Sequence, residues 1–210
     1  MYQELYKNVL RKVYKMKVLY LVRHGQTLFN EQHKIQGWCD SPLTKLGIYQ
    51  ATKARDYFKE NNITFTHAFS STAERTSDTL EIITDITYKR IKDLREWNFG
   101  TLEGESEALN PPLPYKDFFK QYDGETQDEL IERICACVKE IMDGVEENSK
   151  VLIVSHGAAI ANFTRAHQSN WKVQLNQRIG NCCVLKFEYE NDTFSLVEII
   201  NHEFSDFEGK

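Results

Sequence analysis

"VLYLVRHGQTLFN", residues 18–30, runs from apolar residues straight into an arginine, a histidine and a glycine. Five apolar residues in succession are typical of a strand that is buried on both faces of a sheet. Arg23 and His24 therefore stand where the apolar packing stops. Either the two side chains cap the strand in solvent, or they form part of a site.

A second stretch has the same form: "VLIVSHG", residues 151–157, is an apolar run that ends in His156 and Gly157. In open α/β sheets, ligands bind outside the carboxyl ends of parallel strands. Two such strands would bring His24 and His156 into one crevice, and the glycine would leave backbone N–H groups free at the start of the next helix. A single strand-end histidine is more often a surface or core residue. The pair, with Arg23 beside one member, favours a functional site.

The chain as a whole alternates apolar strands with helical segments, which predicts a three-layer α/β/α sandwich with a mainly parallel sheet. Thr44 and Thr126 are suited to cap helices, the second in a capping box with Glu129. A hairpin that turns at Asn191 and Asp192 would add an antiparallel edge. The predicted elements are strands at 17–22, 65–71, 86–94 and 150–155, helices at 44–61, 72–84, 126–145 and from 157, and the hairpin at 182–200.

With 210 residues, 41% of them hydrophobic and 27% charged, the chain suits a single globular domain over 1–210. We interpret residues 1–15 as an N-terminal extension, although their apolar spacing would also suit a short helix. Residues 101–125 form one long excursion, which we expect to be a lid-like loop over the site. Its aromatic residues would face a substrate or, as we favour, form the packed face of a short helix. Its lysines would reach a second anionic group or, as we favour, lie in solvent. These side chains are Tyr115, Phe118, Phe119 and Tyr122, with Lys116 and Lys120.

The formal net charge of −5 argues against a basic face for nucleic acid or anionic lipid. No apolar run is long enough to cross a bilayer. The five cysteines are odd in number and lack a metal-type CxxC pair, so we expect them to be reduced and the protein to be cytoplasmic. The expected partner is a small molecule, and monomer and homodimer both stay open.

Two further residues follow strands at the same predicted edge of the sheet. Arg75 lies in the first turn of a helix, where a guanidinium can bind phosphate in a bidentate manner. Glu96 stands beside Trp97 and Phe99, and aromatic surroundings can raise the pKa of a carboxyl group, as suits a general acid. Neither histidine has a second metal ligand nearby in sequence, so we expect no metal and no cofactor. Two arginines, two histidines and a carboxylate together suit phosphoryl transfer.

With these residues assembled, the chain resembles the histidine phosphatase superfamily, which includes the cofactor-dependent phosphoglycerate mutases. "RHGQT" resembles the family's opening signature, and Asn30 suits the asparagine that follows it. The resemblance covers roughly residues 17–185, and its blocks occur in the family's order. The other matching blocks are "QGWCDSPLTKLGIYQA", "SSTAERTSDT", "LREWNFGTLEG", "VSHG" and the Asn181–Cys182 pair.

The resemblance implies a phosphoglycerate mutase-like fold, no metal, and a role for each matching residue. His24 would be the nucleophile and form a phosphohistidine. Glu96 would protonate the leaving oxygen and then act as the base for water. Arg23, Arg75 and His156 would form the phosphate pocket. The substrate-binding residues would be Thr27, Asn30, Gln36, Gly37 and Gly157.

A mutase has to keep water away from its phosphoenzyme, whereas a phosphatase admits water to hydrolyse it. Mutases of the family exclude water with a longer insertion between the acid and the second histidine, and they carry a histidine–tyrosine pair after the acid. This chain has only residues 101–125 and one helix in that interval, and "EWNFG" at the acid. We therefore favour a metal-independent phosphomonoesterase that acts on a small phosphorylated metabolite. The alternatives are a cofactor-dependent phosphoglycerate mutase and a non-catalytic phosphate-binding regulator on the same fold.

Overall fold

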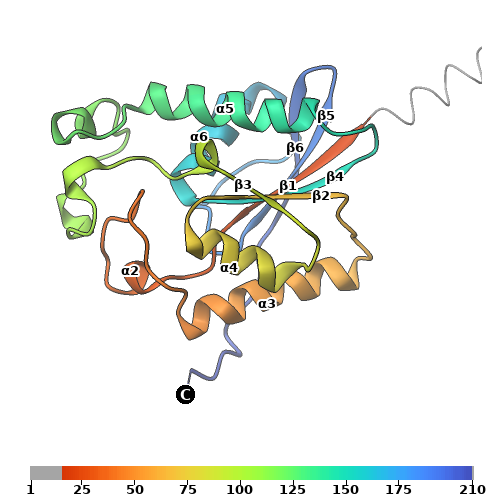
Figure 1. Ribbon diagram of the computed structural model, residues 1–210, viewed down its shortest axis with the longest axis horizontal. Coiled ribbons are helices and arrows are strands. Elements are labelled where there is room, and N and C mark those ends of the chain that lie inside the picture. Colours follow the sequence, from red (N-terminus) through yellow and green to blue (C-terminus); the bar gives the residue numbers. More distant parts are fainter. Residues whose placement is uncertain (1–15, 210) are drawn as a thin grey trace, which may run out of the picture.

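The computed structural model describes residues 16–209 and is built on one six-stranded sheet (Figure 1). The strand order is β3-β2-β4-β1-β5-β6. The first four of these are parallel to one another, whereas β5 runs antiparallel to β1 and to β6. The predicted parallel sheet with an antiparallel edge is thereby confirmed. The strands are β1 (Lys17–Arg23), β2 (His67–Ser71), β3 (Lys89–Ile91), β4 (Lys150–Ser155), β5 (Val184–Glu190) and β6 (Thr193–Ile200). The N-terminal extension, 1–15, lies outside the described residues.

Helices cover both faces of the sheet (Figure 1). Alternate residues of β1 point to opposite faces, so Leu19 and Leu21 pack toward one helical layer while Tyr20 and Val22 pack toward the other. This alternation gives two cores and confirms the three-layer sandwich. The first layer contains α5 (Gln127–Asp143) and α6 (Gly157–Ala166), and the second contains α3 (Lys45–Glu60) and α4 (Glu74–Ile83). A short helix, α2 (Leu28–Glu31), follows β1.

Two helix starts and one turn are as the sequence predicts. The Thr44 hydroxyl accepts a hydrogen bond from the Gly47 N–H, which begins α3. Thr126 and Glu129 form both halves of the capping box at the start of α5. The hairpin between β5 and β6 turns at residues 191–192, and both have positive φ. Each of these features depends on residues within a few positions of one another.

The strand predicted at 86–94 is wrong in extent, because β3 covers only Lys89–Ile91. It lies at the edge of the sheet and pairs only with residues 69–71 of β2, and residues 86–88 are not part of this pairing. After β3 the chain tightens into a 3₁₀ turn, Lys92–Leu94, which buries Leu94 completely. The turn directs the chain toward Glu96.

The 101–125 segment is held against the domain by an aromatic cluster. Phe119 is fully buried in the 3₁₀ turn Phe118–Tyr122. Its ring lies 4.7 Å from that of Phe99 and 5.8 Å from that of Trp97, with Tyr115 and Phe118 also in contact. The packed role that we favoured therefore describes Phe119. Whether the segment closes over a substrate stays a prediction.

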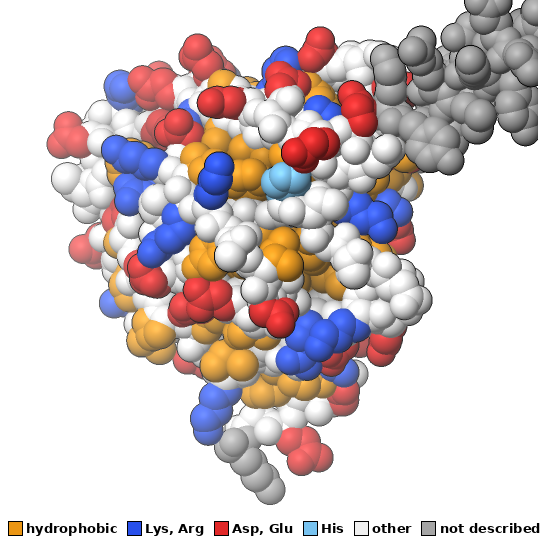
Figure 2. Space-filling view, turned by 45° about the vertical axis from the view of Figure 1, so that its right-hand side comes forward, with side chains coloured by type: hydrophobic (Ala, Val, Ile, Leu, Met, Phe, Trp, Pro, Cys, Tyr) orange, Lys and Arg blue, Asp and Glu red, His pale blue; other side chains and the backbone are white. Residues whose placement is uncertain are grey.

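No helix within residues 16–209 is both long and apolar enough to span a membrane. The face in Figure 2 carries acidic and basic side chains in mixture, with apolar side chains between them. Side chains of one charge sign do not form a continuous patch on this face.

Candidate active site

The pairing of β1 with β4 places the two strand-end histidines side by side. Arg23 and Ser155 are opposite each other in the parallel register, so His24 and His156 leave the sheet at the same edge. Their ring centroids lie 5.3 Å apart. The crevice that the two apolar stretches predict is therefore present, and both imidazoles are buried in it.

His24 is held in one tautomer by its two neighbours. Its Nδ1 lies 2.7 Å from the Gly25 carbonyl oxygen, to which only a protonated nitrogen can donate. Its Nε2 lies 3.3 Å from Nε of Arg75, which can only donate, so Nε2 carries the lone pair. Burial, followed by the charges of Arg75 and Arg23, lowers the pKa of His24 well below its ordinary value. At neutral pH the imidazole is thus uncharged, with its lone pair on Nε2.

His156 is assigned in the same way and has the opposite tautomer. Nη2 of Arg75 donates to its Nδ1 at 2.9 Å, so Nε2–H donates to the Ser71 hydroxyl at 2.7 Å. Burial and the Arg75 charge lower the pKa of His156 well below its ordinary value. The ring is therefore a neutral link between the end of β2 and the guanidinium.

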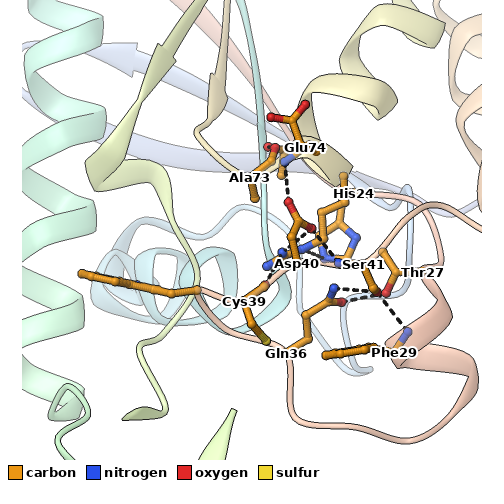
Figure 3. Close-up of polar contacts among 12 residues, drawn as sticks. His24, Thr27, Phe29, Gln36, Cys39, Asp40, Ser41, Ala73 and Glu74 are labelled. Carbon is orange, nitrogen blue, oxygen red and sulfur yellow. Dashed lines mark hydrogen bonds and ion pairs between the residues drawn. The ribbon is translucent and has the colours of Figure 1, made fainter. Parts of the chain in front are cut away.

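Arg75 is fully buried, and each of its five N–H groups has an acceptor. Asp40 forms its ion pair, at 2.8 Å, and the same carboxylate also accepts from the Glu74 N–H at the start of α4 (Figure 3). Asp40 therefore positions the guanidinium. The acceptors are His24 Nε2, the carbonyl oxygens of Gly37 and Cys39, the Asp40 carboxylate and His156 Nδ1.

The Glu96 carboxylate lies at the N-terminus of α6. Oε1 accepts from the N–H groups of Trp97 and Ala159, at 2.9 and 2.8 Å, and Oε2 accepts from the Ala158 N–H at 2.9 Å. A helix N-terminus and three N–H donors stabilise a negative charge. The surroundings of the carboxylate are thus more polar than the neighbouring aromatic residues in the sequence suggested. Glu96 is 7% exposed and lines the pocket.

The pocket next to His24 has a volume of about 780 Å³ and contains hydrogen-bond donors without protein acceptors. Arg23 donates from Nη1 to the Ile179 carbonyl oxygen, whereas its buried Nε has no partner within the described chain. Asn30 uses its side-chain oxygen to accept from the Thr27 N–H and from Asn181. Within residues 16–209 its amide nitrogen makes no hydrogen bond. Such donors suit an anion with several oxygens.

The ten residues predicted for the site divide into two groups in the structure. Six line the pocket: Arg23, His24, Asn30, Gln36, Glu96 and Gly157. The other four lie behind this wall: Thr27, Gly37, Arg75 and His156. Thr27 donates from its hydroxyl to Gln36 at 2.7 Å, and Gln36 in turn donates to Ser41 (Figure 3). These four residues support the wall from behind.

Sequence reasoning missed several contacts that build the site. It gave no role to Ser71, which holds His156, and matched Asp40 to a family block without seeing its ion pair with Arg75. Asn181 was noted only as part of a late block, yet its amide donates to the His24 carbonyl oxygen at 3.0 Å. The pocket-lining Arg178 was missed altogether. None of these residues has a spacing that marks it in the sequence.

Gly157 offers a test of how closely Arg23 is held. A Cβ at this position would lie 3.2 Å from Nε and 3.4 Å from Cζ of Arg23, so Gly157→Ala should displace the guanidinium by a few tenths of an ångström. We expect kcat/KM to fall about 10- to 100-fold, since small misplacements of catalytic groups cost up to that much. Unfolding free energy should stay equal or rise by about 0.5–1 kcal/mol, because alanine is favoured over glycine in a helix.

The matched control is Gly180→Ala, because a Cβ there meets nothing within 4 Å. Steady-state kinetics and thermal melts of both variants provide the comparison. Full activity of Gly157→Ala would mean that the position of Arg23 is unimportant for turnover.

Taken together, the α/β/α fold and the site place a pocket with donors suited to a phosphate-like anion beside a histidine at the carboxyl edge of a parallel sheet. Within residues 16–209, no group of three or more His, Cys, Asp or Glu side chains is placed to hold a metal ion. The family model of the histidine phosphatase superfamily (branch 1) matches residues 19–202. The chain belongs to this superfamily.

Similar proteins carry both mutase and phosphatase names. A probable phosphoglycerate mutase, GpmB, of Yersinia pestis is 33% identical over 195 residues, which cover 83% of this chain and 86% of that protein. The crystal structure of a phosphoglycerate mutase from Bacillus anthracis has a TM-score of 0.75 at 27% identity, over 88% of this chain and 92% of its own. A phosphoserine phosphatase from Entamoeba histolytica, in complex with 3-phosphoglyceric acid, has a TM-score of 0.70 at 27% identity, over 89% of this chain and 98% of its own.

Proposed function

We propose that this protein is a metal-independent phosphomonoesterase that works through a phosphohistidine on His24. The observation that carries the proposal is the tautomer of His24, which lines the pocket and whose uncharged Nε2 carries the lone pair, hydrogen-bonded in this state to Nε of Arg75. A neutral nitrogen nucleophile with cationic donors around it suits attack on phosphorus. The expected substrates are small phosphate esters, and the five unpaired cysteines suit a reducing compartment such as the cytoplasm.

In the first step, His24 Nε2 bonds to phosphorus as the bond from phosphorus to the ester oxygen breaks. The imidazole gains positive charge, which the Gly25 carbonyl stabilises through its hydrogen bond with Nδ1–H. Arg75 loses its acceptor on Nε2 at this moment, so its Nε–H becomes free to donate to a phosphoryl oxygen. Arg23 Nε and the amide of Asn30 supply further donors to the phosphoryl oxygens.

Glu96 handles the proton in both steps. The first step starts from protonated Glu96, with the proton on Oε2, which accepts from one N–H group only within the described residues. This proton passes to the leaving oxygen, which departs as an alcohol. In the second step its carboxylate takes a proton from water as the water oxygen attacks phosphorus and the bond to His24 breaks. The products are the alcohol, inorganic phosphate and the free imidazole, so the enzyme returns to its starting protonation state.

The direct test is hydrolysis of 4-nitrophenyl phosphate in excess EDTA. We expect turnover to be unaffected by the chelator, inhibition by vanadate, and an acid-labile phosphoryl group on the protein after rapid quenching with alkali. Loss of turnover in EDTA with recovery on adding a metal would contradict the proposal. No turnover across a diverse panel of phosphate esters would instead favour a non-catalytic phosphate-binding protein.

A second candidate, phosphoglycerate mutase, is favoured by the names of two similar proteins. A mutase has to keep water away from its phosphoenzyme, whereas a cavity of about 780 Å³ leaves room for water beside a small substrate. Hydrolysis is therefore the better supported outcome. Isomerisation of 3-phosphoglycerate that outpaces its hydrolysis, with a bisphosphate primer present, would decide for the mutase.

A further inference from the structure

The pocket is more cationic than the phosphate site alone requires. Four cationic side chains line it against two carboxylates, in a chain whose formal net charge is −5. Arg23 and Glu96 belong to the phosphate end beside His24. This leaves Lys34, Arg165, Arg178 and Glu107 around the outer part.

Two of these outer groups make contacts of their own, and a third has a favourable position on its helix. The Lys34 ammonium lies over the Phe29 ring, 5.2 Å from its centroid. Arg165 stands in the last turn of α6, where a cation stabilises the helix C-terminus. Glu107 faces His33 at 3.9 Å. Their presence in the pocket wall is explained without a ligand.

Arg178 differs from these groups. It lies in the loop between α6 and β5, directly before Ile179, whose carbonyl oxygen accepts from Arg23. Burial lowers the pKa of Arg23 and the charge of Arg178 adds to this effect, whereas burial raises the pKa of Tyr115 and the same charge opposes the rise. The guanidinium of Arg178 therefore lies near the phosphate end and near the 101–125 segment. Within residues 16–209, its side chain makes no ion pair, hydrogen bond or cation–π contact. Arg178 is exposed, so its N–H groups face solvent in the pocket mouth, and a bound anion can take the place of that solvent as their acceptor.

We propose that Arg178 binds a second anionic group, a carboxylate or a second phosphate, on the ester whose reacting phosphate lies against Arg23 and His24. This inference rests on the proposed function and narrows its substrate class to phosphomonoesters with two anionic groups. The lysines of the 101–125 segment do not take this role. Lys116 and Lys120 do not line the pocket, and Lys120 is paired with Glu129.

The test compares substrates that differ in the second anion alone. 3-Phosphoglycerate and glycerol 3-phosphate differ by a carboxylate against a hydroxymethyl group, and fructose 1,6-bisphosphate and fructose 6-phosphate differ by a phosphate. In Arg178→Gln we expect KM to rise about 10- to 100-fold for the ester that carries the second anionic group, in at least one pair, as for a lost charge-assisted hydrogen bond. The kcat for that substrate, and both constants for the partner ester, should change less than threefold.

Arg178→Lys should recover part of the preference, and Lys172→Gln is the control from the same loop, because Lys172 is paired with Glu188 outside the pocket. The pair that responds identifies the second anion. An equal rise in KM for both members of each pair, or no rise for either member, would overturn the assignment.

A binding experiment separates this inference from the proposed function. Calorimetric titration of His24→Ala with 3-phosphoglycerate and glycerol 3-phosphate, and with the two fructose esters, needs no turnover. If an ester with a second anionic group binds more tightly than its partner, and Arg178→Gln abolishes this difference, the result would support Arg178 even if no ester were hydrolysed. Equal affinity within both pairs in the Arg178-containing protein would overturn the inference while leaving a phosphatase intact.

Discussion

His24→Ala is expected to lower kcat for every phosphate ester by on the order of 10⁵-fold or more, as removal of a covalent nucleophile does. The Nε2 lone pair of His24 has no substitute among the neighbouring groups. His156 is the nearest other imidazole, but it does not line the pocket, and its Nε2 carries the proton that it donates to Ser71. Rapid-quench labelling should show no phosphoryl group on the variant.

The control is His67→Ala, at the amino end of β2 and therefore at the opposite edge of the sheet. It should retain wild-type kinetics. Circular dichroism and thermal melts establish whether each variant is folded. Activity of a folded His24→Ala within tenfold of wild type would refute the phosphohistidine mechanism.

Glu96→Gln is expected to slow the first turnover of alkyl phosphates much more than that of nitrophenyl phosphate. An alkyl phosphate should lose about 10²- to 10⁴-fold in its first turnover, because its alkoxide has to be protonated as it leaves. Nitrophenolate leaves readily without a proton, so its first turnover should survive as a burst. The following steady state should be slow, because the base that activates water is also gone. Stopped-flow kinetics on both esters measures the burst and the steady state.

The geometry of Glu96 requires a stability control for this variant. In the variant, the side-chain oxygen of the glutamine can still accept from the N–H groups of Trp97 and Ala159. Its NH₂ group would then face the Ala158 N–H, so that two donors oppose each other without an acceptor. We expect a loss of about 1–3 kcal/mol in unfolding free energy. Glu105→Gln, an exposed carboxylate in the 101–125 segment, should change neither kinetics nor stability. The same first-turnover loss on both esters would contradict the role of Glu96 as the acid.

The meeting of the strand-end residues beside His24 was largely predictable because these residues follow apolar strands directly. Arg23, His24 and Gly157 are placed by the ends of β1 and β4, and the parallel register brings them together. The strand at 86–94 was overestimated for the opposite reason. Its pattern suits a strand, but only residues 89–91 pair with β2, and strand pairing is a property of the assembled sheet.

Local patterns in the amino-acid sequence sufficed for the layers of the sandwich, the helix caps, the hairpin turn and the two histidine-bearing strand ends. Each of these depends on periodicity or on hydrogen bonds between residues close in the chain. The environment of Glu96, the saturation of Arg75 and the isolation of Arg178 were decided by tertiary packing alone. Glu96 is bound by N–H groups more than sixty residues away, and Arg75 by His156, eighty-one residues away. Such contacts exist only once the strands are paired, so the chemistry of each group is set by its neighbours in space.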